Sequence, residues 1–291
     1  SWSGQRPPKK QNDAAAALRI NSTQLIGLRF HKVGSTSVEQ LLAKSFVRAS
    51  FEHSPLQYYR NGGLDQVRCS MAPDVNRAAF FILFREPGAR LLSSLGYYAA
   101  ILSRFFSKSE AETVQSLMDC PCANYTATQV KLVFEIVQQC GRRMLSEEFG
   151  GGLMLSEYSH YLGSDTDAVL DVLRRDFVVG VTEDIPALVS KLTHFVEPAS
   201  ERPIVLPRLM RSMRKLNQQR VSGFEGQQTF GRFCSMRELT PATAAQVSAL
   251  CGPDAALYEG ARRLAREQQA IDQGPAAAAP VKEFGQACAA H

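Results

Sequence analysis

The chain has 291 residues, of which 45% are hydrophobic and 21% are charged. This composition is typical of a globular protein, and it excludes collagen, coiled coils and wholesale disorder. Lys and Arg total 33 against 28 for Asp and Glu, which gives a net charge of +5. That excess suits an anionic small molecule or acidic polymer but is too small to indicate DNA binding. No apolar run reaches the roughly 18 residues of a membrane-spanning helix.

Hydrophobic patterns predict strands and helices in alternation through the first half of the chain. Residues 24–30 form a continuous apolar run, and a helix with an apolar stripe follows a short Gly/Ser/Thr loop. A second short strand is expected at 46–51. The strongest strand is residues 78–84, whose unbroken apolar run is typical of a parallel sheet covered on both faces. Proline then opens a helix that we expect to extend from residue 87 to about residue 106.

The same alternation continues to the end of the chain. Thr182 is expected to cap the helix that follows a buried strand. The remaining elements are predicted as helices at 110–118, 126–145, 165–175, 208–217 and 240–270, and strands at 152–156 and 177–181. Strands alternating with helices predict an α/β domain with a mostly parallel sheet. We expect one domain over residues 21–272, after a polar stem or linker at 1–20 and before a flexible Ala/Pro tail at 273–291.

Seven cysteines are scattered along the chain, and two glycosylation sequons begin at Asn21 and Asn124. Cys120 and Cys122 have one residue between them, which is too few for the usual zinc or redox pattern. Sequons and scattered cysteines together favour an oxidising secretory compartment. The alternative is a cytosolic protein with free cysteines in its core. The pairing of the cysteines does not follow from the sequence.

A first anion site is predicted where the strand at 24–30 meets a helix through His31-Lys-Val-Gly-Ser-Thr-Ser37. Free backbone N–H groups at a helix N-terminus attract anions, and hydroxyl side chains and Lys32 add donors and charge. The loop is not a Walker A motif, because Lys32 precedes Gly34 and no upstream glycine has the required spacing. An ordinary capped helix beside a chance lysine is the alternative.

A second anion site is predicted at Arg85, which follows the central strand at 78–84. Ligands bind at the carboxyl ends of strands in open α/β sheets. Arg90 and Ser93 lie five and eight residues further on, and an arginine fork with a serine hydroxyl can clamp a phosphate. Alternatively, Arg85 forms a structural ion pair with Glu86 or another carboxylate.

These motifs resemble those of sulfotransferases, particularly the Golgi carbohydrate type. His31-Lys-Val-Gly-Ser-Thr-Ser37 is similar to the 5′-phosphosulfate loop, and Arg85-Glu-Pro-x-x-Arg-x-x-Ser-x-x-x-Tyr97 is similar to the 3′-phosphate motif. Val179-Gly-Val-Thr-Glu183 and Asp254-Ala-Ala-Leu-Tyr-Glu-Gly-Ala261 resemble a strand end and a closing helix of the family. The four matches stand in family order between residues 25 and about 265. The loop lacks the usual proline, and Glu86 replaces the commoner Asp.

The resemblance implies a P-loop-like three-layer fold with a central, mostly parallel sheet flanked by helices. It implies 3′-phosphoadenosine 5′-phosphosulfate (PAPS) as sulfuryl donor and no metal, and the sequence has no compact His/Asp/Glu cluster at ligand spacing. In the family, the loop lysine stabilises the leaving phosphate, a role that falls to Lys32. The residues expected to bind the cofactor are His31, Lys32, Val33, Gly34, Ser35, Thr36, Ser37, Arg85, Arg90, Ser93 and Arg220.

The family also carries a Glu or His base about twenty residues past the loop lysine, where this chain has Glu52 and His53. Successive strand residues face opposite sides, so we expect one of the two to reach the site. Glutamate is commoner in this role, which favours Glu52, although imidazole has the better-matched pKa. Both can instead be exposed strand-end residues. Arg220 ends a basic stretch that is either a rim for anions or a solvated face.

The expected activity is therefore transfer of a sulfuryl group from PAPS to a hydroxyl, most readily on a carbohydrate, which can be acidic. Tyrosyl-protein and small-molecule acceptors are alternatives, as is a non-catalytic relative that binds sulfated glycans. A nucleotide kinase is disfavoured by the missing Walker lysine. We expect a type II membrane protein of the Golgi lumen whose anchor is missing from this chain, with the cytoplasm as the alternative.

Overall fold

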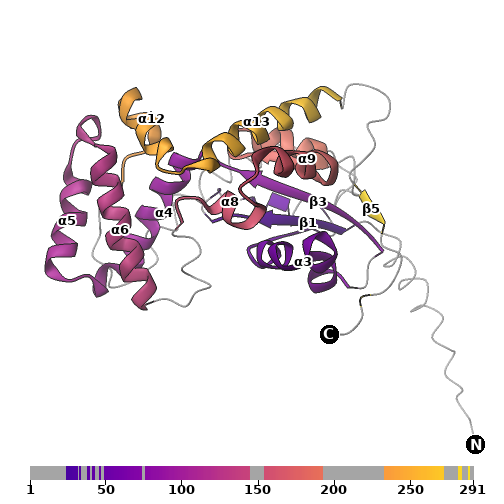
Figure 1. Cartoon of the computed structure of the whole chain (residues 1–291), viewed down its shortest axis with the longest axis horizontal. Helices are drawn as coiled ribbons and strands as arrows, with labels where there is room; N and C mark the ends of the chain where they lie inside the picture. The colour runs from indigo at the N-terminus through magenta and orange to yellow at the C-terminus, as the bar shows by residue number, and fades with distance from the viewer. Residues whose placement is uncertain are drawn as a thin grey trace, which may run out of the picture.

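The computed structural model describes residues 24–31, 33, 38–39, 41–42, 46, 49–73, 76–144, 154–192, 233–271, 281–283 and 288. A single sheet forms its centre, with helices around it (Figure 1). The four parallel strands run in the order β2 (Ala49–Glu52), β1 (Gln24–Arg29), β3 (Arg77–Phe84) and β4 (Phe177–Val181). A short strand, β5 (Val281–Glu283), pairs antiparallel with the start of β3. The predicted mixed α/β fold with a mostly parallel sheet is confirmed.

The helices divide into those near the sheet and those beyond its end. In chain order they are α3 (Ser54–Met71), α4 (Pro87–Leu102), α5 (Lys108–Asp119), α6 (Ala127–Met144), α8 (Glu157–Leu162), α9 (Thr166–Asp176), α10 (Ile185–Leu192), α12 (Pro241–Ala249) and α13 (Pro253–Ile271). Figure 1 shows α5, α6 and α12 gathered with α4 at one end of the molecule, away from α3. Each group has its own hydrophobic core, one around the sheet and one among α4, α5, α6 and α12.

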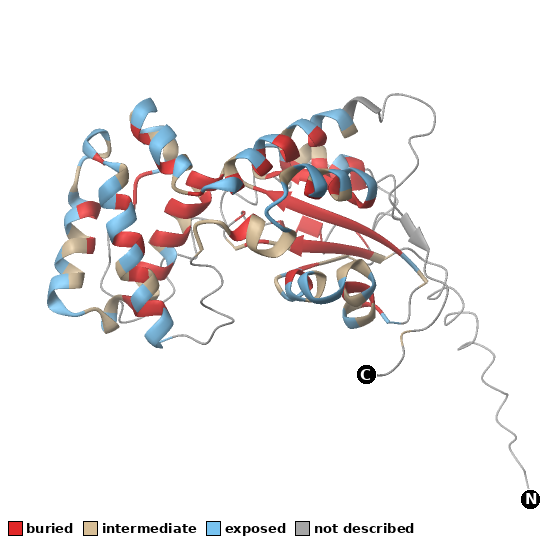
Figure 2. Cartoon of the chain, in the orientation of Figure 1, coloured by how far each residue is buried: buried red, intermediate tan, exposed pale blue. Residues whose placement is uncertain are grey.

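Both faces of the sheet are covered, which explains its continuous apolar runs. On one face, the Tyr158 ring of α8 contacts Phe84, and the Tyr59 ring of α3 contacts Phe177. On the opposite face, Leu188 of α10 packs directly against Gly180. In β3 every residue except the first is buried, and Figure 2 shows the strands as the most buried part of the molecule.

The outer edge of β4 is closed by side chains rather than left open. The Gln268 side chain of α13 accepts from Val179 N and donates to Phe177 O, at 2.9 and 2.8 Å. The buried Lys191 ammonium of α10 donates to Val179 O and Ala265 O, at 3.2 and 2.6 Å. These bonds satisfy backbone groups that would otherwise offer a template for strand pairing.

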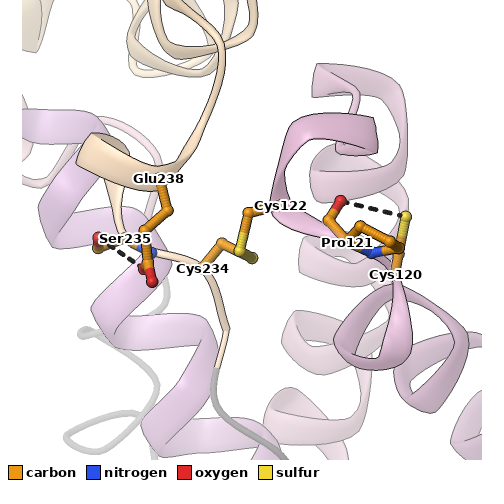
Figure 3. Close-up of a disulfide and its surroundings, with 6 residues drawn as sticks. All are labelled: Cys120, Pro121, Cys122, Cys234, Ser235 and Glu238. Atoms are coloured by element: carbon orange, nitrogen blue, oxygen red, sulfur yellow. Dashed lines mark hydrogen bonds between the residues drawn. A yellow bond between two sulfur atoms is a disulfide. The ribbon is translucent and has the colours of Figure 1, made fainter.

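Two disulfides link segments that lie far apart in the sequence. Cys69 on α3 pairs with Cys288, and Cys122 pairs with Cys234 just before α12 (Figure 3). Cys120 is free, and its Sγ lies against Pro121 O. Cys288 and β5 both fall within the segment expected to be a flexible tail, so the described part of that tail is attached to the domain.

The structure differs from the sequence predictions at several elements. Helix α3 was not predicted, and residues 154–156 are not a strand. Thr182 does not cap the next helix: its hydroxyl lies 2.9 Å from Val33 O and 3.0 Å from Phe84 O, while Asp184 accepts from Ala187 N. The helix predicted at 208–217 lies outside the described residues. Among the described helices, none combines the length and apolarity needed to cross a membrane.

Candidate functional site

Predicted site residues follow the ends of three parallel strands at one edge of the sheet, while Arg90 and Ser93 lie within α4. His31 follows β1, His53 follows β2, Arg85 follows β3 and Thr182 follows β4. This is the edge at which open α/β sheets bind ligands. Lys32, Gly34, Ser35, Thr36 and Ser37, together with Arg220, lie outside the described residues.

His31 is held by Glu157, a residue that the sequence analysis did not single out. Glu157 Oε1 accepts from the His31 backbone N at 2.9 Å and lies 2.6 Å from His31 Nδ1. The Glu157 side chain is completely buried, whereas 15% of the His31 side chain is exposed. One carboxylate oxygen therefore fixes both the backbone and the ring of the first residue of the predicted loop.

Arg90 supplies the opposite charge that lets Glu157 stay ionised inside the protein. Its Nη1 donates to Glu157 Oε2 at 2.8 Å, and its Nη2 donates to Met154 O and Leu155 O. Burial alone would raise the pKa of Glu157, but Arg90 and the His31 hydrogen bonds outweigh it and lower that pKa. Arg90, predicted to contact the cofactor, is itself fully buried and is bonded to the Glu157 carboxylate.

His53 stacks on His31, with ring centroids 4.1 Å apart and planes 12° from parallel. Its Nδ1 lies 2.8 Å from Arg29 O, and because a carbonyl only accepts, Nδ1 carries the hydrogen. Burial, followed by the charges of His31 and Arg29, lowers the pKa of His53 to about 4. Glu52, the favoured base of the sequence analysis, is an exposed strand-end residue.

Arg85 is positioned through its backbone by Tyr158. The Tyr158 hydroxyl donates to Arg85 O at 2.6 Å and accepts from Arg85 N at 3.0 Å. The Arg85 side chain is half-buried, and this burial lowers its pKa, partly offset by Tyr158, Glu183 and Glu86. Ser93, one helical turn beyond Arg90 on α4, is also half-buried.

The N-terminus of α4 is occupied by its own capping residue. Glu86 accepts from Gly88 N and Ala89 N, at 3.0 and 2.6 Å, and Ser248 donates to the same carboxylate at 2.5 Å. Backbone donors that could meet an anion are thus used by a carboxylate. The predicted anion contact after β3 therefore depends on the Arg85 side chain rather than on this helix end.

The closing motif of the sequence analysis has a structural role here. Asp254, in the first turn of α13, accepts from Tyr158 N and Ser159 N at 2.9 Å each and so caps α8. Because α8 carries both Glu157 and Tyr158, this cap holds the two residues that position His31 and Arg85. Burial, followed by the nearby Glu183 carboxylate, raises the pKa of Tyr258, so the same helix lies close to the residues that follow β4.

A cavity of about 170 Å³ lies along β4, between α10 and α13. Lys191, Tyr258, Arg262 and Arg266 are among its lining residues, and none of the predicted site residues is. Within the described ranges, no three His, Cys, Asp or Glu side chains gather as they would to hold a metal ion.

The chain was compared with protein families, curated proteins and solved structures. No family model, no curated protein and no solved structure matches this chain.

Proposed function

We propose that the chain is a PAPS-dependent sulfotransferase with a P-loop-like core. The observation that carries the proposal is the placement of two predicted anion-binding segments at neighbouring strand ends. β1 and β3 are adjacent and parallel, so the loop after Phe30 and the Arg85 segment leave the sheet at the same edge. A ligand with two separated anionic groups could contact both segments, and PAPS carries a 5′-phosphosulfate and a 3′-phosphate.

Sulfuryl transfer depends on positioning of the reactants and on electrostatic stabilisation more than on covalent catalysis by the protein. Sulfuryl transfer is the close relative of phosphoryl transfer, which proceeds in line through a loose transition state. Charge develops on the bridging oxygen of the leaving phosphate, where Lys32 and the loop N–H groups are proposed to act. Arg85, with Ser93, is proposed to hold the 3′-phosphate.

Nucleotide binding is the first test. Adenosine 3′,5′-bisphosphate should raise the melting temperature without added magnesium, because a ligand of the native state stabilises it by about 2.7 kcal/mol at a hundred times its Kd. AMP lacks the 3′-phosphate and should give a much smaller shift. Arg85→Ala should reduce the difference between the two nucleotides, whereas equal shifts in the wild-type protein would remove the basis for the clamp.

Transfer itself is tested with labelled PAPS and a panel of glycans, tyrosine peptides and phenols. Lys32→Ala should lower turnover by about 10²–10³-fold, because the charge that Lys32 meets is greatest in the transition state. Nucleotide affinity should fall less than turnover. Full activity of Lys32→Ala would overturn the proposed mechanism.

The proposed compartment is the lumen of the secretory pathway. Two disulfides support it, since such bonds persist in oxidising compartments. Asn124 of the second sequon is exposed in the turn that begins at the bonded Cys122, which suits glycosylation. Mass spectrometry of the secreted protein, with and without glycosidase, tests this assignment.

A further inference from the structure

We propose that His31 is the proton acceptor of the reaction, with Glu157 as the residue that orients its ring. This inference rests on the proposed function, because it names the base for the same sulfuryl transfer. It differs from the sequence-based choice of Glu52 or His53.

The tautomer of His31 follows from its carboxylate partner. Glu157 has a lowered pKa and accepts from Arg90, so it is ionised and can only accept hydrogen bonds. His31 Nδ1, 2.6 Å from Glu157 Oε1, therefore carries a hydrogen. The lone pair of the neutral ring is then on Nε2. A carboxylate that fixes one ring nitrogen in this way leaves the other as the base in many hydrolases.

The placement of His31 also favours it over the two earlier candidates. It directly precedes Lys32 in the sequence, and 15% of its side chain is exposed. His53 has a pKa of about 4, far from the neutral range in which a base works best. Glu52 is exposed at the end of β2, and no contact to a described residue orients its carboxylate.

With PAPS as the sulfuryl donor, each bond that breaks in the proposed transfer is matched by one that forms. The O–H bond of the acceptor breaks and its proton moves to His31 Nε2 as the oxygen attacks sulfur. The bond from sulfur to the bridging oxygen breaks, and its electron pair stays on the phosphate of the departing adenosine 3′,5′-bisphosphate. The resulting imidazolium keeps its Nδ1–H bond to the Glu157 carboxylate, which stabilises the new positive charge. His53 limits movement of the ring by stacking on its face.

The decisive variant is His31→Asn. An asparagine amide can still donate to Glu157 in place of Nδ1, but it has no basic nitrogen in place of Nε2. Turnover should fall by about 10²–10⁴-fold, with nucleotide affinity changed less than about threefold, and the pH–rate profile should lose its acidic limb. His53→Asn, which can still donate to Arg29 O, should have the smaller effect. A larger loss in His53→Asn, or near-normal turnover in His31→Asn, would overturn the assignment.

The positioning role of Glu157 has a matched control in Asp254. Both carboxylates are fully buried, but Asp254 accepts from backbone N–H groups of α8, whereas Glu157, on that helix, contacts His31. Glu157→Gln should lower turnover and alter the pH–rate profile, whereas Asp254→Asn should lower stability with an unaltered profile. Identical profiles in both variants would overturn the orienting role.

Spectroscopy can determine the tautomer of His31 without any enzymatic reaction. Nitrogen NMR of the wild-type chain should show neutral His31 protonated at Nδ1, and a ring protonated at Nε2 would overturn the inference even if Glu157→Gln does not fold. Inactivity of the wild-type protein with every acceptor would overturn the proposed function, and with it the role of the base. Transfer by the wild type with unimpaired His31→Asn would overturn the base assignment alone.

Discussion

Tyr158 holds Arg85 by both polar groups of its backbone: the phenol donates to Arg85 O at 2.6 Å and accepts from Arg85 N at 3.0 Å. The two residues are 73 positions apart in the sequence, so α8 fixes the direction in which the chain leaves β3. The neighbouring residue on α8, Glu157, fixes His31 after β1. One short helix thus positions two proposed ligand-binding segments.

Tyr158→Phe should lower the free energy of unfolding by about 1–3 kcal/mol, because the phenyl ring leaves the N–H and C=O of Arg85 without their partner. Urea denaturation measures this change. Tyr161→Phe is the control: its half-buried ring lies near Phe30, and its hydroxyl has no hydrogen bond to the described residues. That variant should change stability by less than about 0.5 kcal/mol. Equal free energies of unfolding for the two variants would contradict the positioning role of Tyr158.

Gly27→Ala should destabilise the sheet by about 1–3 kcal/mol. A Cβ at Gly27 would overlap the rings of Phe81 and Phe51, which stack 5.4 Å apart on this face. Gly96 lies inside α4, where a Cβ would make an ordinary contact 3.6 Å from Phe233. Gly96→Ala should therefore stabilise the protein by about 0.5–1 kcal/mol. The melting temperature and the urea midpoint should fall for Gly27→Ala and rise for Gly96→Ala. A change of stability in the same direction for both variants would contradict the close packing around Gly27.

Hydrophobic runs predicted the sheet because its strands are buried on both faces. Continuous apolar runs contain β1, β3 and β4. Helix α3 has no such clear pattern and was missed, because Gly62 and Gly63 interrupt its helical periodicity. Both have non-helical backbone angles, and Gly63 has a φ of 66°. The strand predicted at 152–156 failed because a short apolar run does not distinguish a strand from a turn against a core.

The strand-end residues were found from their motifs, but the residues that hold them were not. Glu157 stands 126 positions from His31, and a single glutamate in a short polar helix has no distinguishing pattern. Arg90 was predicted to contact the cofactor. The sequence shows that this residue is an arginine, but it does not show that the side chain is completely buried. Long-range partners of this kind depend on the packing of α8 against the strand ends, which no local pattern specifies.

Loss of the Cys122–Cys234 disulfide should lower stability by about 2–5 kcal/mol, because the bond closes a loop spanning 112 residues in the unfolded chain. The double variant Cys122→Ala/Cys234→Ala should melt earlier than the wild type and be less sensitive to reductant. Cys140→Ala removes a buried free thiol and should retain the full reductant sensitivity of the wild type. A double variant that melts with the wild type under oxidising conditions would show that this bond adds nothing to folding.

Because the fold holds His53 neutral, the protein should become less stable as the pH falls from about 6.5 to 4.5. The folded-state pKa of about 4 lies below the ordinary value of 6.5, so the unfolded chain binds more protons in this window and stability falls as the pH falls. From pH 7.5 to 4.5 the loss should be about 2–3 kcal/mol. The window stops at pH 4.5 because the lowered pKa of Glu157 makes its own contribution disappear below that value. His53→Asn cannot take up the proton and can still donate to Arg29 O, so its urea midpoint should decline less over the same range. If the two proteins lose stability in parallel, His53 is not held neutral by the fold.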